Sequence, residues 1–525
     1  MSANRALHKN PVRDPVIFKR LPLMRLLALA LGTTLATHAA QAAPIDPAVP
    51  GSDEIFQWVN DITSFGVRSP GSPGSLGASQ YVHDRFAEWG LEHLAFEEAD
   101  TKVWSASKWG LTVDGQALAC SPMQHTFHQG VPAVFNTGPG GRQAELVYVG
   151  NGGDTDFWFK DVRGKIVVAN AKFGKKPLWL FKPFLLHLQD TDKTFGLDYN
   201  LLDPYAGGGF PDSYYRAMDK GAVGFIGVLN DYFDSHQYRN EAYRAYDPGL
   251  AMRIPGLWMS PVAGSQLAER AKAGKLKAAL TLEGRLAAQK GRAVLGYLPG
   301  MSDEIVLIES HHDSATTGAT EDASGTASVM ALARYFSKLP RSQRQRTLMF
   351  ATMDTHFTDY AVHKAFARRH LVENNPLGEK VVAVITLEHI AQEWVPGKDK
   401  KPVPTGRLAP RALMVSTEIP GFKDIVVSAM KEHQLERSFA VSTALTQAVG
   451  GEPGLPADSS DFLRAGVPVI ALVGAPLYLY DDLDTPDKVA KDELGKVAQA
   501  FAEVVRKVSA LPSANFKRLP YRLDD

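Results

Sequence analysis

The sequence predicts an α/β protein: a mostly parallel, twisted sheet sandwiched by helices, with an inserted β-rich region. Beyond residue 291, short apolar runs alternate with helical patterns, which is the order that a parallel sheet covered by helices requires. Residues 144–282 hold several β-rich runs separated by turn residues. Two amphipathic helical patterns precede both regions.

The composition is that of a globular chain with more than one folding unit. The 525 residues are 45% hydrophobic and 22% charged, which provides an ample core and excludes a fibrous or low-complexity protein. The 57 Lys and Arg residues balance 57 Asp and Glu residues, and basic runs are short, so we expect no nucleic-acid partner. Cys120 is the single cysteine, so any metal must be held by His and carboxylate side chains.

Residues 1–42 have the order of a secretory signal peptide. Basic residues precede an apolar run at 26–31, and small residues then lead to Ala40-Gln41-Ala42, so we expect cleavage after Ala42. The apolar run falls short of the roughly 20 residues that cross a bilayer, which predicts no stable membrane anchor after cleavage. The mature protein is therefore expected to be secreted or periplasmic.

Residues 43–143 are assigned to the N-terminal part of the main domain and should begin with two helices. Apolar residues step by threes and fours through residues 52–65 and again through 74–89, where Gly90 ends the pattern.

Residues 144–290 are predicted to form the β-rich insertion. Strands are expected at residues 146–149, 165–169 and 221–228. Residues 176–246 are unusually rich in Tyr, Phe and Pro, and we expect long loops there. The aromatic side chains either pack locally, which is their commoner role, or form a surface that contacts a ligand.

Residues 291–511 are assigned to the second part of the main domain, where strands and helices alternate. The strands are expected at 304–309, 347–352, 381–387 and 467–473, the helices at 325–339, up to Phe366, and at 487–509, and a C-terminal tail at 512–525.

Metal-competent side chains follow the predicted strands of this half. They are His311, His312 and Asp313, then Asp354 and His356, then Glu388 and His389, with Asp458, Asp481, Asp482 and Asp484 around the last strand. Taken one at a time, these residues have simpler explanations. A His after a strand usually makes a hydrogen bond in a loop, and the segment 318–325 is an adequate helix N-terminus without a metal. Because ligands bind at the carboxyl ends of the strands of an open α/β sheet, their coincidence instead predicts a divalent cation that activates a water.

These motifs resemble those of the co-catalytic zinc metallopeptidases, which include secreted bacterial aminopeptidases and glutamate carboxypeptidases. Residues 68–74 resemble the opening loop of the family, and 318–325 resembles the segment whose first acidic residue bridges two metals. Residues 144–282 resemble the protease-associated domain that some members insert. The resemblance implies a zinc-exopeptidase-like fold, zinc as cofactor and a peptide as substrate or ligand.

The resemblance also implies roles for single residues. His311, Glu321, Glu388 and Asp484 fall on metal-ligand positions, and Asp313 falls where the family orients the ligand His. Glu321 and Glu388 stand in place of aspartates, and Asp484 in place of a histidine; each can still bind a cation. One zinc ion is expected at His311, Glu321 and Glu388, whereas the second position keeps an incomplete ligand set.

The Glu-Glu pair of the family, a general base followed by a ligand, aligns with His356-Phe357. Phe357 cannot ligate. His356 is therefore either a third ligand of the second position or the catalytic base, because a nearby cation disfavours the imidazolium. Asp354 or Asp359 takes this role if the alignment shifts.

The predicted function is that of a secreted metal-dependent exopeptidase-like hydrolase, in which a metal-bound water attacks a terminal peptide bond. The alternative is a catalytically inactive peptidase-fold protein that binds a peptide or protein partner, since the general-base Glu is absent. The motifs G-x-S-x-G, H-E-x-x-H and G-x-x-x-x-G-K-[ST] do not occur, which argues against other hydrolase classes. The choice of amino- or carboxypeptidase, the substrate side chain, the metal and the oligomeric state stay open.

Overall fold

The computed structural model describes residues 46–520, except 129–132, 242–247, 374–375 and 446–454. These residues belong to one compact unit, which runs from Ala42 to Asp525. The expected signal peptide and its cleavage site therefore lie outside the described residues. None of the helices that are described is both long and apolar enough to cross a membrane.

The central sheet is parallel in the middle and antiparallel towards its edges. β12 (Ser302–His311) pairs in parallel with β13 (Arg346–Met353) and with β14 (Val381–Glu388), and β14 pairs in parallel with β19 (Val469–Gly474). β17 (Arg411–Val415) runs antiparallel to β19 and parallel to β18 (Ser438–Ser442). The predicted α/β class is confirmed, with a more mixed sheet than the alternation of elements indicated.

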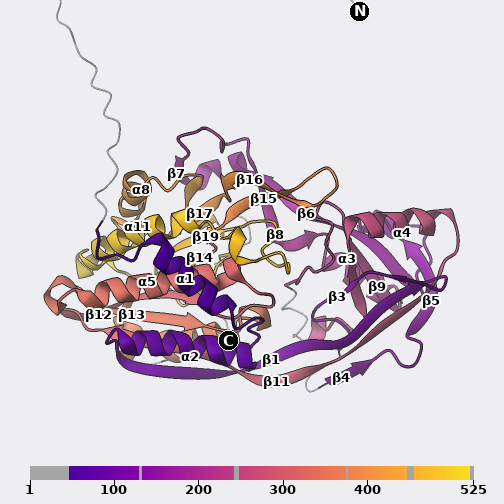
Figure 1. Ribbon diagram of the computed structural model, residues 1–525, viewed down its shortest axis with the longest axis horizontal. Coiled ribbons are helices and arrows are strands. Elements are labelled where there is room, and N and C mark those ends of the chain that lie inside the picture. The colour runs from indigo at the N-terminus through magenta and orange to yellow at the C-terminus, as the bar shows by residue number, and fades with distance from the viewer. Residues whose placement is uncertain (1–45, 129–132, 242–247, 374–375, 446–454, 521–525) are drawn as a thin grey trace, which may run out of the picture. The chain divides into compact units, whose positions relative to one another are not determined.

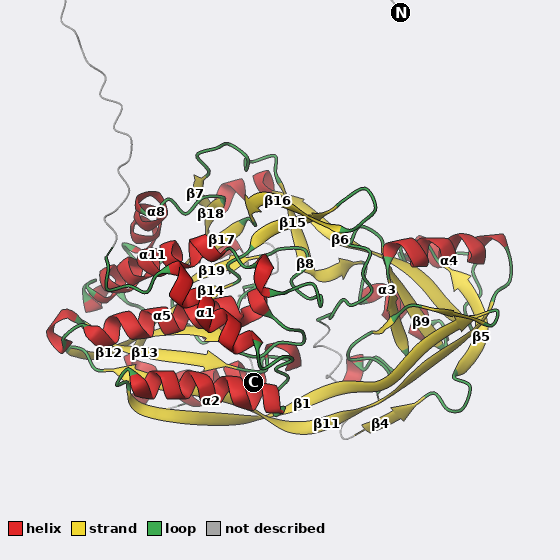
Figure 2. Ribbon diagram, in the orientation of Figure 1, coloured by secondary structure: helices red, strands yellow, loops and turns green. Residues whose placement is uncertain are grey.

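Helices cover both faces of this sheet, and Figure 2 shows those of one face. Alternate residues of β12 enter different cores, as the two-residue period of a strand requires. Val306 and Ile308 pack with the helices α1, α2, α5, α8 and α11, whereas Ile305 and Leu307 pack with α6 and α10. The bounds of these helices are Ser52–Thr63 (α1), Pro73–Glu88 (α2), Ser324–Lys338 (α5), Ala361–Ala367 (α6), Phe422–Glu432 (α8), Ser460–Arg464 (α10) and Lys491–Ser509 (α11).

The predicted helices are confirmed with small shifts at their ends. α2 begins where the Ser72 side chain accepts a hydrogen bond from the backbone N–H of Ser75 and Pro73 fills the first turn. The last helix starts at Lys491 rather than at residue 487, because residues 486–488 form a separate 3-10 turn, η9 (Pro486–Lys488).

Two long strands extend from the central sheet, and the sequence pattern predicted neither of them. β1 (Glu92–Val113) and β11 (Lys277–Leu298) run antiparallel along most of their length (Figure 1). β11 pairs with β13 at one end and with β4 (Ala133–Asn136) and β5 (Arg142–Tyr148) at the other. Most of β1 is exposed or half-buried, so it lacks the apolar alternation that marks a strand in sequence.

The region between these strands has its own sheet. β5, β6 (Ile166–Pro177), β9 (Gly224–Leu229) and β10 (Gly256–Met259) pair in parallel in that order, which confirms the three strands expected there. Two helices accompany them, α3 (Asp212–Asp219) and α4 (Pro261–Ala273). The limits of this region as a domain, 144–290, and its relation to a protease-associated domain stay predictions.

The expectation of long loops at residues 176–246 was wrong for residues 176–241, and residues 242–246 lie outside the described residues. The segment continues β6 and holds η2 (Leu178–Phe184), β7 (Leu185–Gln189), β8 (Asn200–Gly208), α3 and β9. β7 pairs antiparallel with β18 and so extends the central sheet. The local packing of aromatic side chains is confirmed for Tyr214, Tyr232, Phe233 and Tyr238, which are buried in one cluster.

The remaining elements are short. They are β2 (Gln116–Leu118), β3 (Ser121–Pro122), β15 (Gln392–Pro396), β16 (Pro402–Leu408), α7 (Pro376–Lys380), η1 (Asp154–Phe157), η4 (Pro248–Leu250), η5 (Ala319–Ala323), η6 (Arg341–Gln343), η7 (His356–Thr358), η8 (Arg368–Val372) and η10 (Ser513–Asn515).

Candidate metal centre

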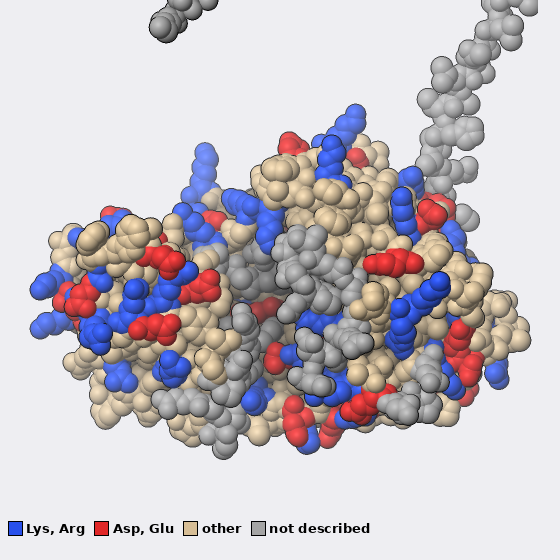
Figure 3. Space-filling view, turned by 180° about the vertical axis from the view of Figure 1, so that it is seen from behind, with Lys and Arg blue, Asp and Glu red and all other residues tan. Residues whose placement is uncertain are grey.

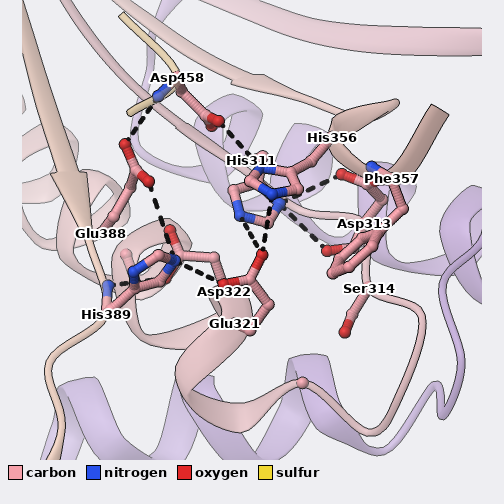
Figure 4. Close-up of polar contacts among 12 residues, drawn as sticks. His311, Asp313, Ser314, Glu321, Asp322, His356, Phe357, Glu388, His389 and Asp458 are labelled. Atoms are coloured by element: carbon pink, nitrogen blue, oxygen red, sulfur yellow. Dashed lines mark hydrogen bonds and ion pairs between the residues drawn. The ribbon is translucent and has the colours of Figure 1, made fainter. Parts of the chain in front are cut away.

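The predicted site residues come together where the parallel strands end. His311 and Asp313 lie at and just after the end of β12, His356 follows β13 in η7, and His389 follows Glu388 at the end of β14. All five are buried in the same polar cluster (Figure 4). Their convergence follows from topology, because parallel neighbours end at one edge of the sheet.

Glu321 and Asp322, the acidic pair before α5, have different roles. Asp322 accepts hydrogen bonds from the backbone N–H of Gly325 at 2.8 Å and from the Ser310 hydroxyl at 2.7 Å, and so it fixes the start of the helix. A Cβ at Gly325 would lie 2.1 Å from Asp322 Oδ2 and 2.2 Å from the carbonyl oxygen of Leu387, so only glycine fits. This leaves Glu321 as the member of the pair that faces the histidines (Figure 4).

Glu321 lies between two imidazole rings. Its Oε1 is 3.2 Å from His311 Nε2, and its Oε2 is 2.6 Å from His389 Nε2. All four atoms are buried, and none of them has a hydrogen-bond partner among the described residues. His389 Nδ1 is 2.7 Å from the carbonyl oxygen of Gly474, which aims Nε2 at Glu321. His311, Glu321 and His389 thus form a group with metal-ligand spacing.

His356 lies beside this group and is held at both ring nitrogens. Its Nδ1 is 3.1 Å from Asp458 Oδ1, and its Nε2 is 3.0 Å from Glu241 Oε1 and 3.3 Å from Glu321 Oε1. The ring stacks on that of His311 at 4.3 Å between centroids. Together, His311, His356 and Asp458 form a second group with metal-ligand spacing.

Asp313 and Arg68 support the first strand end. Asp313 Oδ1 is 3.2 Å from His311 Nδ1, the position from which a carboxylate orients a ligand imidazole. Arg68 is fully buried and donates to the carbonyl oxygens of His312 at 2.7 Å, Thr317 at 2.6 Å and Gly318 at 2.8 Å. The loop between β12 and η5 is therefore fixed by an arginine from the segment that the sequence singled out.

Glu388 and Asp484, both expected as ligands, are turned to backbone N–H groups. Glu388 Oε1 accepts from the backbone N–H of Asp458 at 2.9 Å, and its Oε2 is 3.8 Å from His389 Nε2. Asp484 accepts from the backbone N–H groups of Thr320 at 2.9 Å and Glu321 at 2.9 Å. Neither belongs to a group with ligand spacing among the described residues. Their roles as ligands stay predictions.

The pKa values show how these groups balance one another without a cation. Burial opposes the charged form of Glu321, but His389, His356 and His311 together hold its pKa below the usual range. Burial likewise opposes the imidazolium of His389, yet Glu321 and Asp322 raise its pKa to about 10. Burial and the charge of Asp458 raise the pKa of Glu388 well above its usual value. Protons on the imidazoles therefore supply the positive charge that a divalent cation would supply.

The donor set fits zinc. Zinc takes imidazole nitrogen and carboxylate oxygen in a tetrahedral arrangement, and His311 Nε2, His389 Nε2 and Glu321 provide both kinds of atom, buried and without hydrogen bonds. A buried polar atom that lacks a partner costs about 1–3 kcal/mol, so several in contact indicate a missing ligand rather than accidental packing.

Sequence reasoning named His389 and Asp458 among the metal-competent side chains but gave them no role, and it missed Glu241. His389 stood next to the chosen Glu388 at the same strand end, and Asp458 was noted only as flanking the last strand. Glu241 lies 115 residues from its partner His356 and outside any recognisable motif. Only the three-dimensional structure brings it to the site.

Comparison with known proteins supports a peptidase fold. Residues 293–505 match the model of Peptidase family M28. No curated protein matches the sequence. The peptidase M28 precursor from Shewanella amazonensis SB2B superposes with a TM-score of 0.66 at 19% identity, covering 89% of this chain and 95% of that one.

Two aminopeptidase structures are also similar. The aminopeptidase from Aneurinibacillus sp. strain AM-1 has a TM-score of 0.55 at 19% identity and covers 90% of this chain and 98% of that one. The zinc aminopeptidase BSAP from Bacillus subtilis has a TM-score of 0.59 at 13% identity and covers 88% of this chain and 95% of that one. At these identities the likeness concerns the fold. Residues 293–505 are therefore similar to the Peptidase family M28 domain, in a chain that shares the fold of zinc aminopeptidases.

Proposed function

We propose that this protein is a zinc-dependent aminopeptidase that hydrolyses the first peptide bond of a peptide with a free N-terminus. The observation that carries the proposal is the buried group of His311, Glu321 and His389, whose ligand atoms lack hydrogen bonds and lie beside the His356–Asp458 pair. This proposal replaces the expected ligand Glu388 by His389.

His311, Glu321 and His389 would hold the cation. When bound, a zinc ion supplies Lewis-acid polarisation of the scissile carbonyl and lowers the pKa of water in its vicinity. Asp313 keeps the His311 ring in its orientation through Nδ1, and the carbonyl of Gly474 does the same for His389.

His356 is the proton acceptor in this proposal. Asp458 holds Nδ1, so the other ring nitrogen, Nε2, faces Glu321 and Glu241. Burial and His311 disfavour the imidazolium, but Glu321, Asp458 and Glu241 outweigh them and raise the pKa of His356 well above its usual value. With a cation bound at the neighbouring residues, the imidazolium would be disfavoured, and the neutral His356 ring would accept a proton from water at Nε2.

Glu241 favours an aminopeptidase over a carboxypeptidase. Its side chain is 18% exposed, and it receives a hydrogen bond from the Tyr480 hydroxyl. A partly exposed carboxylate next to the reacting groups attracts the ammonium of a peptide N-terminus and repels a terminal carboxylate.

The second candidate is a binding protein without catalysis, and Phe357 is the observation in its favour. Phe357 occupies a ligand position of the resembling family and is buried against the Tyr480 ring, with centroids 5.3 Å apart. Under this reading the site binds a peptide, and no hydrolysis follows.

A substrate panel separates the two. The zinc-loaded mature protein is assayed on peptides with free and acetylated N-termini. We expect hydrolysis of the free forms, abolished by a chelator and by His311→Ala. His370→Ala is the control. His370 is part-buried, and its Nε2 pairs with Glu97 Oε2 at a distance of 2.8 Å rather than with a residue of these groups. Silence across the panel in a protein that contains zinc supports the binding protein instead.

We further propose that the mature chain works outside the cytoplasm. The basic, apolar and small-residue order of residues 1–42 supports this. Mass spectrometry of the protein recovered from the medium or periplasm should find an N-terminus at Ala43; an intact Met1 would contradict the proposal.

The basic and acidic side chains are interspersed on the face in Figure 3, where the described residues form no continuous basic patch. This distribution is in keeping with a peptide rather than a nucleic acid as substrate.

A further inference from the structure

A second cluster of histidine and carboxylate side chains lies on the other side of Asp458. Glu309 lies near the end of β12 and His363 lies in α6, and with Asp458 they have metal-ligand spacing. His363 Nε2 is 3.5 Å from Asp458 Oδ2 and 3.9 Å from Glu309 Oε2. All three side chains are 0% exposed.

The ligand atoms of this cluster are unsatisfied. Glu309 Oε2, Asp458 Oδ2 and both ring nitrogens of His363 are buried and have no hydrogen-bond partner among the described residues. The other oxygen of each carboxylate is engaged: Glu309 Oε1 receives the Thr386 hydroxyl, and Asp458 Oδ1 lies against His356. Each carboxylate thus has one oxygen engaged by another residue and one bare oxygen near His363.

The distances match a shared cation better than direct hydrogen bonds. Charge-assisted hydrogen bonds between nitrogen and oxygen are about 2.7–2.9 Å long, well below both distances from His363. Ligands bound tetrahedrally to zinc at ~2.1 Å lie ~3.4 Å apart, which matches the 3.5 Å to Asp458 and is nearer than a hydrogen-bond length to the 3.9 Å to Glu309. Leaving these atoms bare in the interior would carry the desolvation penalty of an unsatisfied polar group.

We propose that Glu309, His363 and Asp458 bind a second divalent transition-metal ion, such as zinc, apart from the ion at His311, Glu321 and His389. Glu309 and His363 match none of the ligand positions that the peptidase resemblance implies. The two carboxylates balance the double charge of the ion, and His363 supplies the imidazole.

This ion has a structural role. It ties β12, α6 and the segment at Asp458 together inside the core, where Phe462 lies 6.2 Å from the His363 ring between centroids. It also fixes the Asp458 carboxylate, whose other oxygen orients His356. Metal at the second site would therefore support the first site without touching substrate.

The test is the zinc content of the whole mature protein after zinc loading and desalting. Elemental analysis compares the wild type with His363→Ala, Glu309→Gln, His311→Ala and the double variant His311→Ala/His363→Ala, with His370→Ala as control. We expect two zinc ions per chain in the wild type and control, one in each single variant and none in the double variant. Glu309→Gln keeps the size of the side chain, so it tests the site even if His363→Ala fails to fold.

Two results would overturn the second site. One is two ions per chain in folded Glu309→Gln or His363→Ala, and the other is a single ion in the wild type that only His311→Ala removes. In both cases the cluster holds shared protons instead of a cation. The proposed peptidase activity is measured separately, so its failure and that of the second site are distinguishable.

Discussion

The two buried groups of histidine and carboxylate residues use the same kinds of side chain in different surroundings. The group of His311, Glu321 and His389 adjoins His356 and the partly exposed Glu241. The cluster of Glu309, His363 and Asp458 is closed in by a helix and by side chains such as Phe462. The two groups are equally buried, so the partly exposed Glu241 beside the first group, not ligand chemistry, separates a site proposed for catalysis from one proposed for stability.

Removing a ligand from the group of His311, Glu321 and His389 should have the largest effect on activity. We expect His311→Ala to lower kcat/KM at least about a thousandfold, because several kcal/mol of electrostatic stabilisation are lost with the cation. Steady-state kinetics of the zinc-loaded variant measures this, and circular dichroism checks that it folds. Activity within tenfold of the wild type would assign catalysis to other residues.

Asp458 contacts both groups, so its variant compares them directly. Asp458→Asn keeps the shape but weakens its hold on His356, and residues that orient a catalytic group cost about 10–100-fold when changed. We expect a fall of that size in kcat with KM nearly unchanged, together with one zinc ion fewer per chain. An unchanged kcat in a variant that has lost this ion would confine Asp458 to the closed cluster.

Glu241 adjoins only the group of His311, Glu321 and His389. Glu241→Gln removes the negative charge that faces the substrate, and we expect KM for peptides with a free N-terminus to rise about tenfold, with zinc content unchanged. Glu269→Gln is the matched control, since Glu269 is exposed on α4 and pairs with Lys272. An equal rise in KM in both variants would point to the overall charge of the protein rather than to the site.

Thr386 contacts only the cluster of Glu309, His363 and Asp458, so its substitution should have the smallest effect of the four. Its hydroxyl donates to Glu309 Oε1 inside the core. Thr386→Val leaves that oxygen unsatisfied, and we expect a loss of about 1–3 kcal/mol in the free energy of unfolding, measured with urea. A variant as stable as the wild type would show that the Glu309 carboxyl does not depend on this hydrogen bond.

The sequence predicted the parts of the fold whose pattern is local. The apolar steps of α1, α2 and α5 and the buried runs of β12, β13 and β14 are strong signals, and the structure has them within a few residues. β1 was missed because its side chains are largely exposed, and β7 was expected as loop because its pairing with β18 is a long-range contact.

The candidate site was predictable only as a region. Strand ends and motifs led to His311, Glu321 and His356, and all three converge. The choice between Glu388 and His389 depends on side-chain direction, since Glu388 turns to the backbone of Asp458 while His389 turns to Glu321. His363 and Glu309 carried no signal at all, because a helix residue and a strand residue become neighbours only in the folded chain.

Anomalous X-ray scattering from crystals of the zinc-loaded protein tests the central claim most directly. We expect an anomalous peak for a zinc ion within bonding distance of His311 Nε2, His389 Nε2 and a Glu321 oxygen. Glu388 and Asp484 should still accept hydrogen bonds from backbone N–H groups. A peak that is bonded to Glu388 or Asp484 in place of His389, or no peak at Glu321, would contradict the metal centre described above.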